Sequence, residues 1–369
     1  MIRASEMVLP GHPDKFCDQV ADAIVAECYA VDPEAYCQVE VSVWSDRVWL
    51  SGGTGTRTPL RRPLEAIVKQ VGREIGYVKG NAIDADLYQV HDVVCQAHGD
   101  PRQWTHRVND QSISVGWAGY DAKVAYLPPE HFLAEAFREA LTAGCREQAL
   151  AGCGPDGKLL VRLRENSDSW VLEHVLVTLQ QRETAHLADV IAGVDQVLER
   201  RYAALRRRDP RWQAPWQDVE LCVNPNGPLV DAGSQGDNGQ TGRKLAMDFY
   251  GPRVPIGGGA IFGKDLSHID RLGAYASREA AVEAVQAGAR ECKVVLCYAP
   301  NRDVPLDVVY ELDTVRRIPQ KPREAFAHSA LRGTWGPGRA AGRSPCGLEA
   351  WRLGLRGVGV PKGPEDETS

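Results

Sequence analysis

The segment Gly11-His12-Pro13-Asp14-Lys15 places an imidazole, a carboxylate and an ammonium within a few positions at the start of a predicted helix. Pro13 suits the first helical turn, because the N–H that proline lacks would have no helical partner there. Apolar residues then recur at intervals of four, which predicts a buried stripe. They are Phe16, Val20, Ile24 and Cys28.

Another face of the same predicted helix carries Asp14, Asp18 and Asp22 at the same interval. One interpretation is an ordinary amphipathic helix whose acidic first turn interacts favourably with the helix dipole. The other is a functional cluster, and the pentapeptide alone does not decide between them. A second polar cluster, much later in the chain, favours the functional interpretation.

Length and composition limit the class of protein. A chain of 369 residues is too long for one core, which predicts two or three domains. The net charge of −6, without a basic stripe, argues against a nucleic-acid partner. No apolar run reaches the roughly 18 residues of a membrane helix, and the N-terminus lacks the apolar core of a signal peptide. Ten scattered cysteines indicate reduced thiols, so we expect a cytoplasmic protein that binds no membrane.

Strand-like and helix-like segments alternate along the chain, and each third pairs strands with a long helix. This pattern predicts an α+β fold built from three similar α/β subdomains. The predicted helices, after the first, cover residues 63–75, 130–148, 186–207 and 271–288. The predicted strands cover residues 36–50 with a turn at 45–47, 159–163, 170–180, 222–226 and 292–298.

Composition also predicts the domain limits. The N-terminal, central and C-terminal domains are expected at residues 1–105, 106–222 and 223–328, with a polar surface loop at 97–109 as the first linker. Residues 329–369 are rich in Gly, Pro and Arg, which predicts a poorly ordered tail because such a segment buries little apolar area. Some order is expected around residues 348–355.

The second polar cluster combines glycines with basic residues. It consists of residues 236–244 (GDNGQTGRK), residues 257–265 (GGGAIFGKD) and the pair Asp270-Arg271. Glycines let backbone N–H groups approach an anion closely, while arginine and lysine supply charge. A polyphosphate needs several cations or metal ions around it, so the cluster predicts a polyphosphate site. Two surface loops without function are the plainer alternative.

A P-loop is the weaker interpretation of the same residues. Gly258, Gly263 and Lys264 have P-loop spacing, but Asp265 occupies the position of the hydroxyl that reaches magnesium. The preceding residues 252–256 contain two prolines, which are largely confined to edge strands and strand starts.

Together the two clusters resemble the S-adenosylmethionine synthetases (methionine adenosyltransferases), over roughly residues 5–312. The matching segments, in the family's order and spacing, are residues 11–15, 110–111, 155–158 and 224–271. The resemblance implies a three-domain α+β fold with pseudo-threefold symmetry. It also implies a homodimer, or a dimer of dimers, with active sites at the subunit interface.

The family reaction displaces the triphosphate of ATP from C5′ by the methionine thioether and then cleaves it to pyrophosphate and phosphate. A neutral sulfur needs no general base, so catalysis depends on orientation and on leaving-group charge. The resemblance implies that Asp14 and Asp270 hold two Mg²⁺ per site and that His12 lies beside the breaking bond. It assigns the phosphates to Lys158, Arg243, Lys244 and Lys264. It assigns nucleotide contacts to Asp110, Asp156 and Asp237, together with Arg243, Lys244 and Lys264.

Several positions depart from the family pattern, mostly around the amino-acid substrate. Thr54 replaces a glutamate whose carboxylate pairs with the substrate amino group. Val41 replaces a glutamate associated with K⁺, and Glu40 lies one residue away, on the opposite strand face unless a bulge intervenes, so K⁺ binding is doubtful. Further departures are His268 for a lysine of the active site, Leu229 for an aromatic residue and Pro300 for an aliphatic one.

These departures leave three hypotheses. The first is a methionine adenosyltransferase, although a buried ammonium without its carboxylate costs several kcal/mol unless Asp237 substitutes. The second keeps the ATP chemistry but uses a different small-molecule nucleophile. The third is a non-catalytic partner subunit of a true synthetase. Retention of His12, Asp14, Lys158, Lys264 and Asp270 argues against the third.

Overall fold

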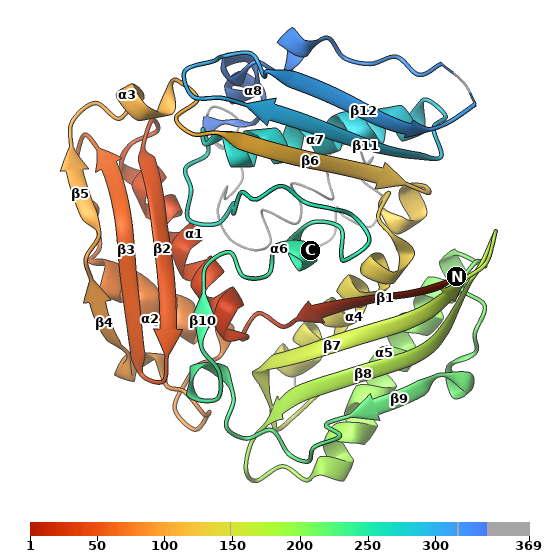
Figure 1. The fold of residues 1–369 in the computed structure, drawn as a ribbon. Coiled ribbons are helices and arrows are strands. Elements are labelled where there is room, and N and C mark those ends of the chain that lie inside the picture. The colour runs from red at the N-terminus through yellow and green to blue at the C-terminus, as the bar shows by residue number, and fades with distance from the viewer. Residues whose placement is uncertain (148, 316, 338–369) are drawn as a thin grey trace.

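The computed structural model describes residues 1–147, 149–315 and 317–337. Within these residues the strands form three sheets, each packed against helices, around a centre that the segment between β9 (Glu220–Val223) and α7 (Ile269–Gln286) crosses (Figure 1). The predicted α+β fold class is confirmed. Among the described helices, none combines the length and apolarity that a membrane crossing requires.

The first sheet has the order β10-β2-β3-β4, and β5 also pairs with β3. Its strands are β2 (Tyr36–Trp44), β3 (Arg47–Thr56), β4 (Gln89–Asp92), β5 (Cys95–His98) and β10 (Gly239–Gln240). Helices α1 (Pro13–Val31) and α2 (Leu64–Ile75) pack with it. The predicted stripe from Phe16 to Cys28 is confirmed, since all four side chains are fully buried in this core. Helix α2 ends, as predicted, at Gly76, whose φ of 113° favours glycine.

The second and third sheets have the orders β1-β7-β8-β9 and β12-β11-β6. The second comprises β1 (Ile2–Val8), β7 (Cys153–Glu165), β8 (Trp170–Gln181) and β9 (Glu220–Val223), covered by α4 (Pro129–Arg146) and α5 (Leu187–Arg208). The third comprises β6 (Ser112–Gly119), β11 (Glu291–Tyr298) and β12 (Asp307–Asp313), covered by α7 (Ile269–Gln286) and α8 (His328–Trp335). The shorter helices include α3 (Arg102–Thr105) and α6 (Leu245–Asp248).

Each sheet takes one strand from outside the third of the chain to which it mainly belongs. Strand β1 pairs with β7, β6 pairs with β11, and β10 pairs with β2, all antiparallel. This exchange satisfies backbone groups that would otherwise lie at sheet edges. The contiguous limits 1–105, 106–222 and 223–328 stay a prediction, and the sheets connect the three thirds across them.

Two expectations about irregular segments need correction. The predicted surface loop at 97–109 contains the end of β5 and helix α3. Helix α3 is held against the first sheet by Trp104, whose ring centroid lies 5.4 Å from that of Tyr36. The predicted poorly ordered tail begins inside helix α8, which buries Leu331 and stacks Trp335 on Tyr275. The expected order at 348–355, and residue 148 at the predicted end of the second helix, lie outside the described residues.

The aspartate face of α1 fixes the segment that crosses the centre of the molecule. The Asp14 carboxylate accepts the N–H of Gln240 at 2.9 Å, and Asp18 accepts that of Gly242 at 2.9 Å. Asp22 accepts the N–H of Gly263 at 3.0 Å. α1 is a capped amphipathic helix with an acidic first turn, as one interpretation had it, and all three aspartates of its second face are buried against the crossing segment.

A buried ion pair extends this contact to the third sheet. Arg271, in the first turn of α7, donates from both terminal nitrogens to Asp22 at 2.9 and 3.1 Å. It also donates to the carbonyl oxygens of Ile261 at 3.1 Å and Lys264 at 2.8 Å. Helix α1, helix α7 and the glycine-rich segment between residues 257 and 265 therefore share one guanidinium.

We expect Arg271→Met to lower the free energy of unfolding by about 3–5 kcal/mol, because it leaves the Asp22 carboxylate buried without its cation. Arg290→Met breaks an exposed ion pair with Asp313 and should cost at most about 1 kcal/mol. Urea denaturation of both variants measures the difference. Equal losses would contradict a structural role for the buried pair.

Candidate active site

The first group of predicted site residues lies at the start of α1. His12 is the N-cap residue, and its Nδ1 accepts the N–H of Asp14 at 3.2 Å. Lys244 forms an ion pair with the Asp14 carboxylate, and the Arg243 Nε lies 3.6 Å from the same carboxylate. Burial would raise the pKa of Asp14, but hydrogen bonds from Lys244 and from the Gln240 amide hold it below its ordinary value.

His12 is neutral and has one ring nitrogen free for a ligand. Burial, followed by the charges of Lys244 and Lys158, lowers the pKa of His12 to about 4. Because Nδ1 accepts a hydrogen bond, the ring proton is on Nε2. That Nε2 is buried and has no hydrogen-bond partner among the described residues. The Asp237 Oδ2 lies 4.0 Å from Nε2.

Asp156 supplies a second unsatisfied atom near this helix start. Its Oδ2 accepts the N–H of Gly233 at 2.7 Å, whereas its buried Oδ1 has no partner within the described part of the chain. Burial raises the pKa of Asp156 to about 6. Lys158, two residues further along β7, is exposed and lies 3.7 Å from the Asp237 carboxylate. Among the described residues, a buried donor and a buried acceptor are thus both unpaired, which is typical of a ligand site.

The second group lies at the start of α7. His268 is the N-cap residue, and its Nδ1 accepts the N–H of Asp270 at 3.2 Å. The Asp270 carboxylate accepts hydrogen bonds from Lys264 at 2.6 Å and from the Ser112 hydroxyl at 2.6 Å. Burial lowers the pKa of His268 to about 4, against the opposing charge of Asp270. Asp110 is exposed and also acts electrostatically on His268.

The structure thus divides the predicted residues between two helix starts. The first group comprises His12, Asp14, Asp156, Lys158, Asp237, Arg243 and Lys244, and the second comprises Lys264, His268 and Asp270, with Asp110 nearby. The segment 239–265 and the ion pair of Asp22 with Arg271 connect the two groups.

Two family descriptions match this chain. The N-terminal domain of S-adenosylmethionine synthetase matches residues 1–97, and the C-terminal domain matches residues 232–328. Together these matches cover more than half of the chain. The chain belongs to the S-adenosylmethionine synthetase family. These matches support, in general terms, a transferase function of the methionine adenosyltransferase type. Both helix starts lie inside the matched residues, whereas Asp110, Asp156 and Lys158 lie between them.

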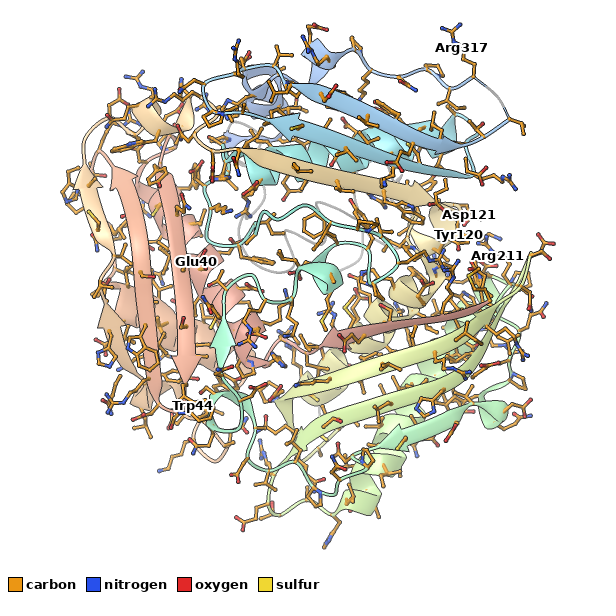
Figure 2. The ribbon with its side chains drawn as sticks, in the orientation of Figure 1. Glu40, Trp44, Tyr120, Asp121, Arg211 and Arg317 are labelled. Carbon is orange, nitrogen blue, oxygen red and sulfur yellow. The ribbon has the colours of Figure 1, made fainter. Side chains whose placement is uncertain are left out.

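The departures around the amino-acid substrate occupy different environments. Strands β2 and β3 pair without a bulge from Tyr36 opposite Gly55 to Trp44 opposite Arg47. No bulge therefore compensates for the one-residue offset between Glu40 and Val41. The Val41 side chain is buried in the core, and Glu40 lies part-way along β2 on the opposite face of the strand (Figure 2). Thr54 is buried on the core side of β3, so this hairpin position offers no carboxylate.

The remaining departures lie in connections. Leu229 is half-buried and accepts the N–H of Gln181 through its carbonyl at 2.9 Å. Pro300 is exposed in the turn after β11. His268, by contrast, contacts a predicted site residue directly.

Lys15 has a different place from the other charged residues of the opening pentapeptide. It is buried beneath the site, where it donates to Asp18 at 2.9 Å and pairs with Asp248. Sequence reasoning missed Asp248 and Ser112. The spacing of Asp248, four residues after Lys244, and the position of Ser112, directly after the matched Asp110-Gln111, were the available signals.

The P-loop interpretation is wrong. Residues 252–263 contain no strand, and α7 begins at Ile269 rather than directly after Lys264. A P-loop needs a strand before its glycines and a helix immediately after its lysine.

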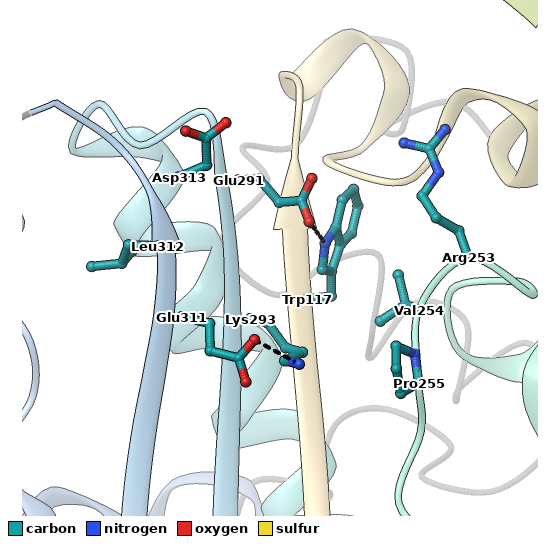
Figure 3. Close-up of a pocket in the computed structure, with 9 residues that line it drawn as sticks. All are labelled: Trp117, Arg253, Val254, Pro255, Glu291, Lys293, Glu311, Leu312 and Asp313. Carbon is teal, nitrogen blue, oxygen red and sulfur yellow. Dashed lines mark hydrogen bonds and ion pairs between the residues drawn. The ribbon is translucent and has the colours of Figure 1, made fainter. Parts of the chain in front are cut away.

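A cavity of about 260 Å³ lies on the outer side of the third sheet, next to residues 253–255 (Figure 3). Its charged side chains are already paired, with Lys293 bound to Glu311 at 2.7 Å and Glu291 accepting from Trp117 at 2.8 Å. None of the predicted site residues lines it. We therefore locate the candidate active site at the two helix starts.

Asp156→Asn should stabilise the fold above pH 6. The raised pKa means that burying the charged carboxylate costs stability above about pH 6, and that this cost disappears as pH falls toward the ordinary value of 3.8. The variant should gain up to about 3 kcal/mol at pH 8, and the gain should vanish near pH 4. Urea denaturation at both pH values measures this gain in the free energy of unfolding.

Asp237→Asn, at a half-exposed carboxylate of the same group, is the control. No gain at pH 8 for Asp156→Asn would contradict the raised pKa of Asp156.

Proposed function

We propose that this chain is a methionine adenosyltransferase, which joins ATP to L-methionine and releases phosphate and pyrophosphate. The observation that carries the proposal is the arrangement at the start of α1. A neutral histidine with an unpaired Nε2–H lies there among Lys158, Arg243 and Lys244. Helix N-termini also favour anions through their free N–H groups and dipole.

The unsatisfied atoms suit a nucleotide. The His12 Nε2–H can donate to the oxygen that is bonded to the attacked carbon. This hydrogen bond would stabilise the negative charge that develops on the leaving group as the carbon–oxygen bond breaks. The Asp156 Oδ1 can accept a hydroxyl, as a ribose provides. Both atoms are buried without a partner in the part of the chain that the structure describes, so a ligand that pairs them removes a desolvation cost of about 1–3 kcal/mol for each.

The aspartates suit Mg²⁺ that arrives with phosphates. Among the described residues there is no group of three or more His, Cys, Asp or Glu side chains placed to hold a metal ion. Mg²⁺ is usually bound through one or two carboxylates plus substrate phosphates and water, so single aspartates fit it. Asp14 and Asp270 would each hold one ion, and bound Mg²⁺ would neutralise charge on the leaving triphosphate. The Val41 side chain offers no oxygen ligand, so we propose no K⁺ site.

The lysines paired with these aspartates have a second task in this proposal. Lys244 and Lys264 bind Asp14 and Asp270 in the ligand-free chain and would turn to the phosphates when the aspartates bind metal. Arg243 and Lys158 are already half-exposed beside them. Because the attacking sulfur is neutral, these residues need only orient the reactants and stabilise the leaving group.

A second candidate function rests on Thr54. The family glutamate is missing at this position and the threonine is buried, so the acceptor could be a small molecule other than methionine. The ATP chemistry would be unchanged. The non-catalytic partner subunit remains the third candidate.

We also propose a homodimer or a dimer of dimers. The outer faces of the first and third sheets expose Trp44, Trp49, Ile113 and Val309, and exposed apolar faces are typical of protein interfaces. The cysteines of the described residues are free thiols, which supports a reducing compartment such as the cytoplasm.

The decisive experiment incubates the purified protein with ATP, Mg²⁺ and methionine and detects S-adenosylmethionine by mass spectrometry. We expect product with Mg²⁺ and none without it. Lys158→Met should lower kcat/KM by about 10²–10³-fold, as loss of one group that stabilises developing charge does. Arg162→Met is the matched control, because Arg162 lies on the same strand and is 45% exposed, against 58% for Lys158.

Each other outcome identifies a different candidate. Triphosphate cleavage without S-adenosylmethionine favours a different nucleophile. No reaction at all, together with activation of a separate synthetase, favours the partner subunit.

A further inference from the structure

Helix α6 lies at the centre of the molecule, directly after the charged residues Arg243 and Lys244 (Figure 1). Its last residue, Asp248, pairs with the ammonium of Lys15, which is buried near the start of α1. The same ammonium donates to Asp18 at 2.9 Å. One cation of α1 therefore binds a carboxylate of its own helix and a carboxylate of α6.

These contacts fix both ends of a short stretch, residues 243–247, to one turn of α1. Before the stretch, the N–H of Gly242 donates to Asp18 at 2.9 Å. After the stretch, Asp248 binds Lys15. Because Lys15 and Asp18 also bind each other, the contacts are closed, and we call them the contact ring. The two cationic residues that begin the stretch therefore have a backbone that is held on both sides.

The Asp248 side chain acts through the Lys15 ammonium. Its second oxygen, Oδ2, is buried and has no hydrogen-bond partner among the described residues. Burial raises the pKa of Asp248 to about 7, against the opposing charge of Lys15. The charged carboxylate therefore costs stability at pH 8, where an unfolded chain ionises it freely. A neutral replacement should not destabilise the fold at that pH, so the role of the side chain can be tested separately from its effect on stability.

The contact ring supplies a restraint that the candidate site needs. In the proposed function the Lys244 side chain leaves Asp14 and turns to a phosphate when Asp14 binds metal. The backbone of Lys244 has to keep its place during this change, because ordering a loose segment on binding reduces affinity. The ion pair with Asp14 cannot hold the backbone once it opens. The contact ring does not include Asp14 and stays closed.

We propose that Asp248 is a positioning residue, which acts through Lys15 to hold the backbone of Arg243 and Lys244 in the geometry that binds a polyphosphate. This inference rests on the proposed function, because it takes the ligand of these two residues to be a polyphosphate. In this role Asp248 contacts no substrate itself. It limits the motion of residues that do.

The experiment compares variants of Asp248 that keep or remove the acceptor for Lys15. Asp248→Asn keeps an accepting oxygen, whereas Asp248→Leu has the same branched shape but no acceptor and opens the contact ring. Asp248→Ala also lacks the acceptor and repeats the test with a smaller side chain. The probe is inorganic tripolyphosphate with Mg²⁺, and its Kd for the full-length protein is measured by calorimetry at pH 8. Asp209→Ala is the matched control, because Asp209 is also a buried carboxylate paired with an arginine, at the end of α5.

We expect Asp248→Leu and Asp248→Ala to weaken tripolyphosphate binding about ten-fold, which is the effect of losing about one hydrogen bond to a charged group. Asp248→Asn should recover most of the affinity, because its oxygen keeps the contact ring closed, and Asp209→Ala should bind like the wild type. Urea denaturation at pH 8 should show no loss in the free energy of unfolding for Asp248→Asn. Wild-type affinity in Asp248→Leu and Asp248→Ala would overturn the proposal. So would an equal loss of affinity in the Asn and Leu variants, or no binding by the wild type.

Failure of the proposed function has a different result. If the wild type binds tripolyphosphate and needs the acceptor at Asp248 but forms no S-adenosylmethionine, the role of Asp248 stands and methionine transfer does not. If the wild type forms S-adenosylmethionine while Asp248→Leu binds tripolyphosphate with wild-type affinity, the function stands and the role of Asp248 does not.

Discussion

The hydrogen bonds that backbone N–H groups of the segment 239–263 donate to the α1 aspartates are the interaction on which the rest of the structure depends. That segment has only the two-residue strand β10 and the four-residue helix α6, so most of its amides lack partners from secondary structure. Asp14, Asp18 and Asp22 accept three of them. Buried carboxylates are costly unless they are paired, and each of the three has a cation: Lys244, Lys15 and Arg271.

The same contacts position the charged residues of the candidate site. Because the segment is bound to α1, Arg243 and Lys244 lie beside Asp14, and Arg271 holds the carbonyl of Lys264 next to Asp270. Asp248 is held by Lys15, and burial raises its pKa to about 7. His12 Nε2 and Asp156 Oδ1 have no partner among the described residues, although the groups around them are paired. The candidate ligand site includes these two atoms.

The sequence predicted much of the local structure, because amphipathic periods identify elements that bury one face. The helices α1, α2, α4, α5 and α7 and the strands β2, β3, β7, β8 and β11 were all expected. Strands β1, β4, β5, β6, β10 and β12 were not. Strands β1, β6 and β10 pair across the expected domain limits, and β12 is an edge strand with half-exposed side chains. Sequence spacing contains no signal for such exchanges.

The residues of the candidate site were predicted by type, but their grouping was not. Spacing placed Asp14, Asp18 and Asp22 on one face, and only the fold shows that this face is buried. The departure at Val41 depended on whether β2 has a bulge, which the register of β2 with β3 decides. Only the cap hydrogen bonds show that His12 and His268 cap their helices in the same way, because the two helix starts share only a His-x-Asp pattern.

The aspartates of α1 hold the amides of the site segment. Amide hydrogen exchange of Gly242 and Gly263 tests this role most directly, since both lie outside regular helices and strands. We predict exchange nearly as slow as that of the buried turns of α1, and a selective increase at Gly242 in Asp18→Ala. Exchange of both amides at the rate of an exposed loop in the wild type would contradict the account.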